Sequence, residues 1–296
     1  MLPYLLLLLT LLFSSTSFGL TFYLPQRGDN IVGEVQVVKV QDGDNIYAIA
    51  RQFDIGLDEL KAANPTIDTK SLSLGQKVII PGAFILPLSP HNGIVINLPE
   101  LRLYYYPPYG SYVMTFPIGI GKEGWSTPVG QTSVLSKEDY PNWYPPESIR
   151  EYTQKSKGYT LPKVVPAGPG NPLGDYAIHL EWQSMLIHGT NQPTSVGQRS
   201  SSGCIRMYPE DVAQLFSEVQ PGTPVYVVYQ PYKVGWYHGE LYEEVHKTLK
   251  EYLTTFSLSD GINQATQGRV VYLDQNRIEQ LKALALGYPI LVGRAK

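Results

Sequence analysis

The chain has 296 residues, of which 43% are apolar and 17% are charged, and its formal net charge at pH 7 is −3. This composition supports a folded core and excludes disorder over most of the length, and the slightly negative charge does not indicate nucleic-acid binding. Cys204 is the one cysteine, which excludes an intrachain disulfide and a cysteine-rich zinc site. The 24 prolines, 27 glycines and 22 tyrosines favour short strands and turns over a helical bundle.

The N-terminal segment has the pattern of an export signal. Residues 2–13 are mostly apolar, and this run is shorter than the roughly 20 residues that a membrane-spanning helix needs. Ser17-Phe18-Gly19 follows with the small-x-small pattern of a signal-peptide cleavage site. We therefore expect residues 1–19 to be a signal peptide and Leu20 to begin an exported protein without a stable membrane span. An uncleaved anchor is the alternative.

Segment 37–81 is predicted to be a β-α-α-β unit, because two β-prone runs enclose two helical patterns. The first helix is expected to begin at Asn45, with Asp44 as its cap. The second has Asp58 as its candidate cap and must stop before Pro65.

This unit resembles the LysM domain in the stretches QDGDNIYAIA, ANPTID and GQKVIIP. LysM domains bind glycans that contain N-acetylglucosamine, such as the glycan strands of peptidoglycan. The resemblance implies that two loops, one before the first helix and one after the second, form the glycan contact. The residues that it points to are Gly43, Asp44, Asn45, Ile46, Asn64, Pro65 and Ile67. The alternative is that these residues only cap and turn a small domain.

Residues 82–92 (GAFILPLSPHN) contain two prolines, Pro87 and Pro90, and are expected to be a linker. β-prone runs with recurring turn signals follow, which predicts a β-sandwich or barrel. Three proline-rich segments interrupt these runs and are expected to be loops, where functional residues often lie: 127–130, 140–146 and 164–174.

The second half of the chain alternates strands and helices around one informative stretch, HGTNQPTSVGQRSSSGCIRM at 188–207. Segment PEDVAQLFSEV after it has helical spacing and is expected to lead into a strand at 223–229. GWYHGELYEEVHK is expected to form a hairpin. Two further helices are predicted near 248–256 and 275–286.

Cys204 is the candidate nucleophile, because a free cysteine in an exported protein is a liability unless it is used. Its serine and glycine neighbours leave the sulfur approachable, and the start of the following helix favours the thiolate. His188 ends a β-prone run. The loop that follows can bring the Cys204 sulfur within hydrogen-bonding reach of the His188 imidazole, which would form a Cys–His pair. An imidazolium there would lower the pKa of the thiol further. Taken alone, the two residues are equally compatible with an inert buried cysteine and a structural histidine.

The whole stretch resembles the catalytic signature of the L,D-transpeptidase family, in HGTN, Gly197 and SSSGCIRM. TPVG, NPLG, GIVINLPELRLYYY and FPIGIG match that family as well. The resemblance implies a mainly β chain, with a sandwich-type catalytic domain at 92–229 after the LysM-like domain at 37–81. Residues 230–296 form a C-terminal extension to which it assigns no role. The domain order is similar to that of periplasmic enzymes of diderm bacteria, so the resemblance implies the periplasm.

By this resemblance, Cys204 attacks the carbonyl of meso-diaminopimelate in a peptidoglycan tetrapeptide stem and releases the terminal D-alanine. A thioester acyl-enzyme results. His188 takes the thiol proton, and the backbone carbonyl of Gly189 orients its ring. The acceptor is an amine, either of another stem or of the C-terminal lysine of a murein lipoprotein. The resemblance implies no cofactor and no metal.

The expected oxyanion donors are backbone N–H groups around Ser202, Gly203 and Cys204. Many relatives carry histidine at the position of Ser202, so a second imidazole is not essential. Arg206 is expected to hold a substrate carboxylate or to brace the loop, and His179 to pack on the sheet. Further substrate contacts are expected from Thr190, Asn191 and Ser201.

Two alternatives from other classes stay open. One is a hydrolase on the same fold, in which water replaces the amine, giving an L,D-carboxypeptidase or a lipoprotein-releasing enzyme. The other is a non-catalytic protein that binds peptidoglycan through the LysM-like unit. A papain-like or NlpC-like peptidase is disfavoured, because those enzymes place cysteine before histidine in the chain.

Overall fold

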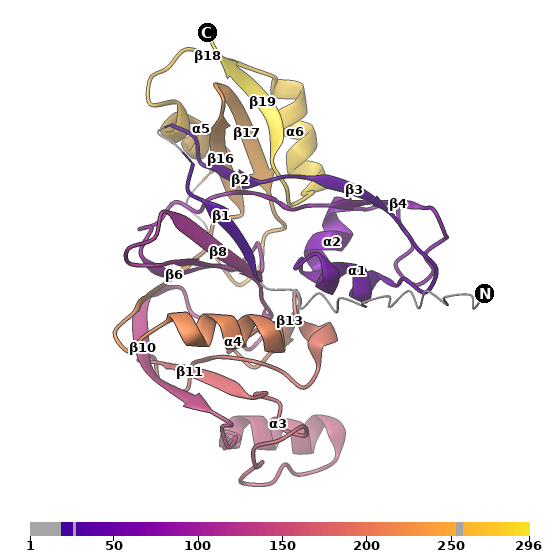
Figure 1. Ribbon diagram of the computed structural model, residues 1–296, viewed down its shortest axis with the longest axis vertical. Helices are drawn as coiled ribbons and strands as arrows, with labels where there is room; N and C mark the ends of the chain where they lie inside the picture. Colours follow the sequence, from indigo (N-terminus) through magenta and orange to yellow (C-terminus); the bar gives the residue numbers. More distant parts are fainter. Residues whose placement is uncertain (1–18, 26–27, 253–256) are drawn as a thin grey trace, which may run out of the picture.

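The computed structural model describes residues 19–25, 28–252 and 257–296. The predicted signal peptide, except for Gly19, therefore lies outside the described residues. Among those residues, no helix has both the length and the apolar character needed to cross a membrane. Figure 1 shows a central sheet, with the LysM-like unit at its side, the C-terminal sheet at one end of the long axis and α3 at the other.

The LysM-like unit has the predicted β-α-α-β order. Strand β3 (Gln36–Lys39) pairs with β4 (Lys77–Ile80) in antiparallel fashion, and α1 (Ile46–Gln52) and α2 (Leu57–Ala63) lie between them in sequence. α2 ends before Pro65, as predicted.

Both predicted helix caps are wrong by one or two residues. Asn45 caps α1, because its side-chain oxygen accepts two backbone N–H groups of the first turn. Asp44 instead accepts the backbone N–H of Gln41 at 2.7 Å. The cap of α2 is Gly56, and Asp58 lies in the first helical turn, where its charge suits the helix dipole.

The central sheet has nine strands, in the order β1-β8-β7-β6-β15-β10-β11-β12-β14. Their bounds in that order are Leu20–Tyr23, Tyr112–Pro117, Arg102–Tyr106, Gly93–Asn97, Pro224–Val228, Gly130–Asp139, Tyr176–Leu180, Leu186–His188 and Ile205–Arg206. The first half of β10 pairs with β15 and its second half pairs with β11, with a register shift between Val134 and Ser136. The sheet therefore turns at β10 and folds back over its own apolar face. The chain is mainly β, as predicted.

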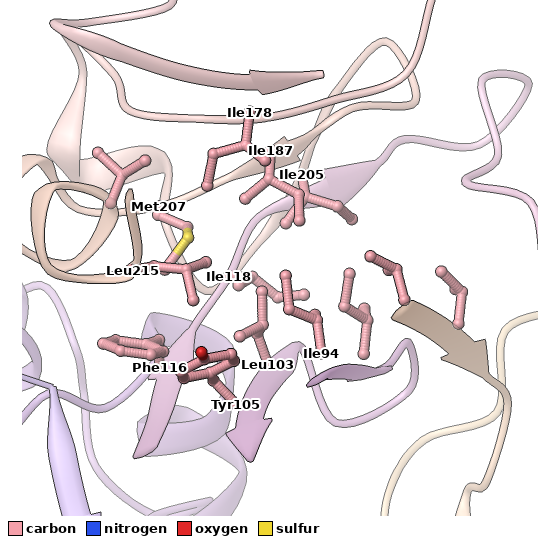
Figure 2. Packing of buried hydrophobic residues seen from close by; sticks show 14 of the residues in the cluster. Ile94, Leu103, Tyr105, Phe116, Ile118, Ile178, Ile187, Ile205, Met207 and Leu215 are labelled. Atoms are coloured by element: carbon pink, nitrogen blue, oxygen red, sulfur yellow. The ribbon is translucent and has the colours of Figure 1, made fainter. Parts of the chain in front are cut away.

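Apolar side chains from both halves of this sheet form one buried cluster. Figure 2 shows Leu103 and Phe116 on one side of the cluster, Ile178 and Ile187 on the other, and Leu215 of α4 (Pro209–Glu218) near them. Burial on both sides explains the continuous apolar runs in these strands.

A helix that the sequence did not predict, α3 (Glu147–Lys157), lies between the two proline-rich segments 140–146 and 164–174 that were expected to be loops. It ends at Gly158, which adopts a left-handed conformation with φ +76°. Thr153 is the buried residue of this helix. Because almost all of α3 faces solvent, its sequence carries no apolar stripe that a periodicity argument can detect.

The predicted linker at 82–92 is wrong in its first part. Strand β5 (Ala83–Ile85) pairs with β2 (Ile31–Gly33), and all three residues of β5 are buried. A second apolar cluster contains Leu60 of α2, Phe84 of β5 and Tyr104 of β7. The LysM-like unit and the central sheet therefore share a core.

A buried arginine joins the same two parts. Arg102 on β7 donates to the Glu59 carboxylate of α2 at 2.8 Å and to the backbone carbonyl of Asp54 at 3.1 Å. Both side chains of the Arg102–Glu59 ion pair are almost fully buried. The pair has hydrogen-bonding partners on both sides, which offsets much of the desolvation that such a pair costs.

The C-terminal extension forms its own four-stranded sheet with two helices. The predicted hairpin is present as β16 and β17, and the predicted helix near 275–286 is α6. The helix predicted near 248–256 is wrong within the described residues, since α5 begins at Leu258. The bounds are β16 (Tyr232–Tyr237), β17 (Glu240–Val245), α5 (Leu258–Thr266), β18 (Val271–Leu273), α6 (Gln275–Leu284) and β19 (Ile290–Ala295).

Lys233 on β16 forms a buried ion pair that links this extension to the rest of the protein. Its ammonium lies 2.9 Å from Glu100 and 2.7 Å from Glu244, and all three side chains are buried. Glu100, Glu244 and His246 are spaced closely enough to hold a metal ion. The ammonium group already supplies positive charge to both carboxylates, so the cluster is an ion-pair network of this chain.

Replacing Arg102 by methionine should destabilise the protein by about 3–5 kcal/mol, because Glu59 is left buried without its cation. Burial already raises the pKa of Glu59, and Arg102 opposes that rise. Without Arg102 the pKa rises further, so the loss should be greatest at neutral and alkaline pH and shrink as acid protonates Glu59. Urea unfolding across pH measures this.

The matched control is the double variant Arg102→Met, Glu59→Gln, which removes both charges. It should recover a large part of the stability at neutral pH. Equal losses of unfolding free energy in the single and double variants would contradict a role for the Arg102–Glu59 ion pair.

Candidate active site

The parallel pairing of two very short strands builds the site. β12 (Leu186–His188) and β14 (Ile205–Arg206) align Ile187 with Ile205 and His188 with Arg206. Side chains two residues apart on a strand share a face, so the register that places His188 beside Arg206 also places Cys204 beside Leu186. All four side chains line one cavity.

Contacts within the cavity fix the tautomer of His188. Its Nδ1 atom lies 2.6 Å from the backbone oxygen of Gly189, which is the carbonyl that the sequence analysis named. A carbonyl only accepts, so Nδ1 carries the proton and Nε2 is the nitrogen free to accept one. The role of this contact in catalysis stays a prediction.

The thiol of Cys204 is half-buried and lies 3.6 Å from the backbone oxygen of Ser184. Its hydrogen therefore has a backbone acceptor within the wide limit of sulfur hydrogen bonds. Cys204 and His188 face the same cavity, and the hydrogen bond of the thiol in this conformation is to Ser184 and not to the imidazole.

Burial makes both groups neutral in the resting site. It lowers the pKa of His188 to about 3, with the nearby Arg206 charge acting in the same direction. It raises the pKa of Cys204, although the Leu186 backbone and Arg206 oppose that rise. The expectation of a thiolate favoured by its surroundings is therefore wrong for this conformation, because desolvation outweighs the helix end and the neighbouring cation.

The loop around Cys204 is held by its own hydroxyl groups. Ser201 is buried, donates to the Cys204 carbonyl at 2.5 Å and accepts the Gly203 N–H at 3.1 Å. Ser201 thus braces the loop at the cavity wall. Because the Gly203 N–H is already bonded, the Ser202 and Cys204 N–H groups are the better candidates for an oxyanion.

Thr127, which the sequence analysis did not select, is a second brace. It is fully buried, donates to the Gly203 carbonyl at 2.7 Å and accepts the Gly121 N–H at 3.1 Å. Gly203 has φ +112°, a conformation that side chains rarely adopt, so the chain needs glycine there. The TPVG segment can be recognised in the sequence, but its contact with Gly203 joins residues far apart in the chain and cannot be predicted from a local pattern.

The C-terminal extension also reaches this loop. Tyr252 donates its hydroxyl to the Thr127 carbonyl at 2.6 Å and stacks on Tyr229. Glu251 forms an ion pair with Arg199, which lies on β13 (Arg199–Ser201). Part of the extension therefore packs behind the catalytic loop.

Arg206 braces the loop on its other side. Its Nη1 atom donates to the hydroxyls of Ser195 and Ser200 at 2.9 and 3.4 Å. Its buried Nε has no hydrogen-bond partner among the described residues, and the side chain lines the cavity. Bracing and substrate contact are thus both compatible with its position.

The cavity measures about 520 Å³, and the segment around α3 forms one wall of it. Tyr152 of α3 packs edge-on against Trp125 with ring centroids 5.8 Å apart, which fixes the helix beside the catalytic loop. His179 on β11 packs on the sheet, where its Nε2 lies 3.3 Å from Oε2 of Glu138 on β10, and its side chain also lines the cavity.

The other predicted substrate residues lie elsewhere. Thr190 is buried and its hydroxyl accepts the Gln192 N–H at 2.9 Å, while Asn191 is exposed. Neither is among the described residues that line the cavity. Their assignment as substrate contacts has no support in this geometry.

The predicted glycan residues divide into two groups. Ile46 is buried in the core, and buried Asn64 bonds to the backbone of Leu60 and Ile79, so these two act as structural residues. The others lie at the surface or half-buried in the two loops: Gly43, Asp44, Asn45, Pro65 and Ile67.

Comparison with known proteins matches both parts of the chain to families. The YkuD model, an L,D-transpeptidase catalytic domain, matches residues 91–227, and the LysM domain model matches residues 38–81.

The chain is similar to two proteins of Escherichia coli strain K12. It is 43% identical over 237 residues to the probable L,D-transpeptidase YcfS, a match that covers 78% of this chain and 74% of that protein. It is 42% identical over 245 residues to the probable L,D-transpeptidase ErfK/SrfK, covering 81% and 78%. Among solved structures, the catalytic domain of an E. faecium L,D-transpeptidase aligns at 25% identity over 48% of this chain and 100% of that chain, with a TM-score of 0.37.

Alkylation of Cys204 by iodoacetamide should be slow and should accelerate only at alkaline pH, because burial raises the pKa of the thiol. His188→Ala should leave the pH at which alkylation accelerates nearly unchanged, since the imidazole is already neutral near pH 7. Mass spectrometry of the alkylated protein, sampled over time across pH, gives the rates. A fast rate that is flat between about pH 5 and 8 and is lost in His188→Ala would show a thiolate–imidazolium pair instead.

Proposed function

Because this chain belongs to the L,D-transpeptidase family and carries a LysM domain, we propose that Cys204 transfers peptidoglycan stem peptides through a thioester. The observation that carries this proposal is the β12–β14 register, which places Cys204 and His188 on one face of one cavity. The donor is a tetrapeptide stem, and the acyl group is that of its meso-diaminopimelate.

The first half-reaction forms the thioester. The Cys204 sulfur attacks the carbonyl carbon while its proton passes to Nε2 of His188, which is the unprotonated nitrogen in the described tautomer. The resulting oxyanion accepts hydrogen bonds from the backbone N–H groups of Ser202 and Cys204. When the carbonyl re-forms, the C–N bond to D-alanine breaks and the leaving amine takes the proton from His188.

The second half-reaction forms the new amide. An acceptor amine attacks the thioester carbon and gives its proton to His188, and the sulfur leaves and recovers a proton from the imidazolium. The acceptor is the side-chain amine of another stem or the C-terminal lysine of a murein lipoprotein. If water reaches the thioester instead, the same site is a carboxypeptidase or a lipoprotein-releasing hydrolase.

Location follows from the same proposal. Peptidoglycan is outside the cytoplasmic membrane, so the protein must be exported, and we assign residues 1–19 as a signal peptide cleaved after Gly19, with the periplasm as destination. The LysM domain then keeps the enzyme on glycan strands through its loops, with Gly43, Asn45 and Pro65 as the exposed candidates.

Substitutions in the cavity test the catalytic roles. His188→Ala should slow D-alanine release from a tetrapeptide stem by ~10²–10⁴-fold, as is typical for loss of a general base. Cys204→Ala should abolish release. Ser202→Ala should lose little, because Ser202 has no group that acts as a base near neutral pH, and Ser202→His is the matched variant that should also be tolerated. A loss in Ser202→Ala as large as that in His188→Ala would contradict the assignment of the base.

The acceptor is tested with the same donor stem in the presence or absence of a peptide that ends in lysine. Mass spectrometry of the products should show a new amide between the two peptides. Tripeptide alone, with no joined product for either a stem or a lysine acceptor, would identify the protein as the hydrolase.

Binding to the cell wall is tested with the full-length Cys204→Ala protein, because the LysM domain shares its core with the central sheet. The protein should pellet with insoluble peptidoglycan, and soluble N-acetylglucosamine oligomers should release it. Pelleting that these oligomers do not affect would contradict glycan binding by the LysM loops.

A further inference from the structure

The first described strand begins beside a buried carboxylate. Leu20 opens β1 (Leu20–Tyr23), and its backbone nitrogen donates to Oδ2 of Asp54 at 3.1 Å. The preceding nitrogen, that of Gly19, donates instead to the Gln214 amide oxygen at 2.9 Å. The nitrogen of Gly19 therefore has a neutral acceptor, and the nitrogen of Leu20 has an acidic one.

Asp54 belongs to a buried cluster of acids. It is 2% exposed at the end of α1, and Asp211 in the first turn of α4 is 1% exposed. Each of these two carboxyls influences the titration of the other. When one of the two carboxyls is protonated it hydrogen-bonds to the other, and no other described group donates to Asp211.

No cation among the described residues is hydrogen-bonded to the carboxylate of Asp54 or Asp211, although the charge of Arg102 lowers the pKa of both groups. Arg102 gives its guanidinium to Glu59 and reaches Asp54 only at the backbone carbonyl. Arg51 on α1 pairs with Glu210 at the protein surface. Tyr208, before α4, also faces the two aspartates and carries no positive charge.

The surroundings therefore disfavour the ionised acids. Burial raises the pKa of Asp54 to about 7 and raises that of Asp211 well above its usual value, and repulsion from Asp54 adds to the rise for Asp211. A buried carboxylate without a counter-ion costs several kcal/mol, so a cation placed here would stabilise the fold.

We propose that cleavage after Gly19 supplies this cation, because the new α-ammonium group of Leu20 forms a buried ion pair with Asp54 and Asp211. The inference rests on the cleavage site proposed above. Hydrolysis by a signal peptidase adds water across the Gly19–Leu20 bond, leaving a carboxylate on Gly19 and an amine on Leu20 that is protonated near pH 7.

No large movement is needed to form the pair. The nitrogen that becomes the ammonium already lies 3.1 Å from Asp54, and an ammonium has three donors where the amide had one. The pair joins three elements of different parts of the protein: β1 of the central sheet, the end of the LysM helix α1, and α4, which follows the catalytic motif. Maturation thereby tightens the contact between the LysM domain and the catalytic domain.

Two purified chains test the pair: residues 20–296 and residues 19–296, each released from a fusion partner that leaves no extra residue. The added Gly19 moves the same ammonium charge next to Gln214. The chain that starts at Leu20 should unfold at a temperature higher on the order of 2–4 °C. The difference should vanish when both chains carry Asp54→Asn, and should persist when both carry Asp42→Asn, which alters an exposed acid of the same domain.

N-terminal reactivity gives a second measurement. In the native chain that starts at Leu20, the amine should react more slowly with an acylating reagent than in the chain that starts at Gly19, and Asp54→Asn should remove the protection. Equal unfolding temperatures for the two chains, or a difference that survives Asp54→Asn, would overturn the proposal.

The purified chains test the ion pair wherever the cell cuts the precursor. N-terminal sequencing of the exported protein tests the cut separately, and a mature chain that begins at any residue other than Leu20 would also overturn the proposal. Both results are independent of whether the enzyme transfers or hydrolyses its thioester.

Discussion

The candidate active site depends on the parallel pairing of β12 and β14, two strands of three and two residues. A slip of one residue would turn Cys204 away from the face that carries His188. The register is fixed from outside the pair, because Arg206 exchanges two backbone hydrogen bonds with Gly119, at 2.7 and 2.9 Å. The Met207 N–H also bonds to the His188 carbonyl at 2.9 Å. The relative placement of Cys204 and His188 is therefore set at the edge of the sheet, by the β12–β14 pairing and by the backbone bonds to Gly119, which follows β8.

The flanking domains hold the same loop from two directions. On the LysM side, the Asp58 N–H bonds to the Gly197 carbonyl at 3.1 Å, and a side chain at Gly197 would collide with the backbone of Gly56. On the other side, Tyr252 of the C-terminal extension supports Thr127, and Thr127 supports Gly203. The LysM domain and the candidate active site thus belong to one connected body. In the proposed function, a LysM domain tied in this way sets where the cavity lies relative to the glycan strand.

The parts that the sequence predicted are those with strong local patterns, namely the LysM unit, the strands around the HGTN and SSSGCIRM stretches, and the C-terminal hairpin. Local patterns do not predict α3, because an exposed helix has no apolar stripe. They favour a linker at 82–92, although Ala83–Ile85 form a buried strand between Pro81 and Pro87. The charge state of Cys204 could not be read from neighbouring residue types, since it depends on how much of the fold covers the thiol. Thr127 and Tyr252 bind the loop across long stretches of chain, which no local motif records.

The mass of the protein during turnover shows directly whether Cys204 carries the acyl group. Wild-type protein mixed with a tetrapeptide stem, without acceptor, and quenched in acid within milliseconds to seconds should gain the mass of the tripeptide acyl group. Fragmentation should place that mass on the peptide that contains Cys204. Release of D-alanine with no covalent intermediate, or with the acyl group on another residue, would contradict the account.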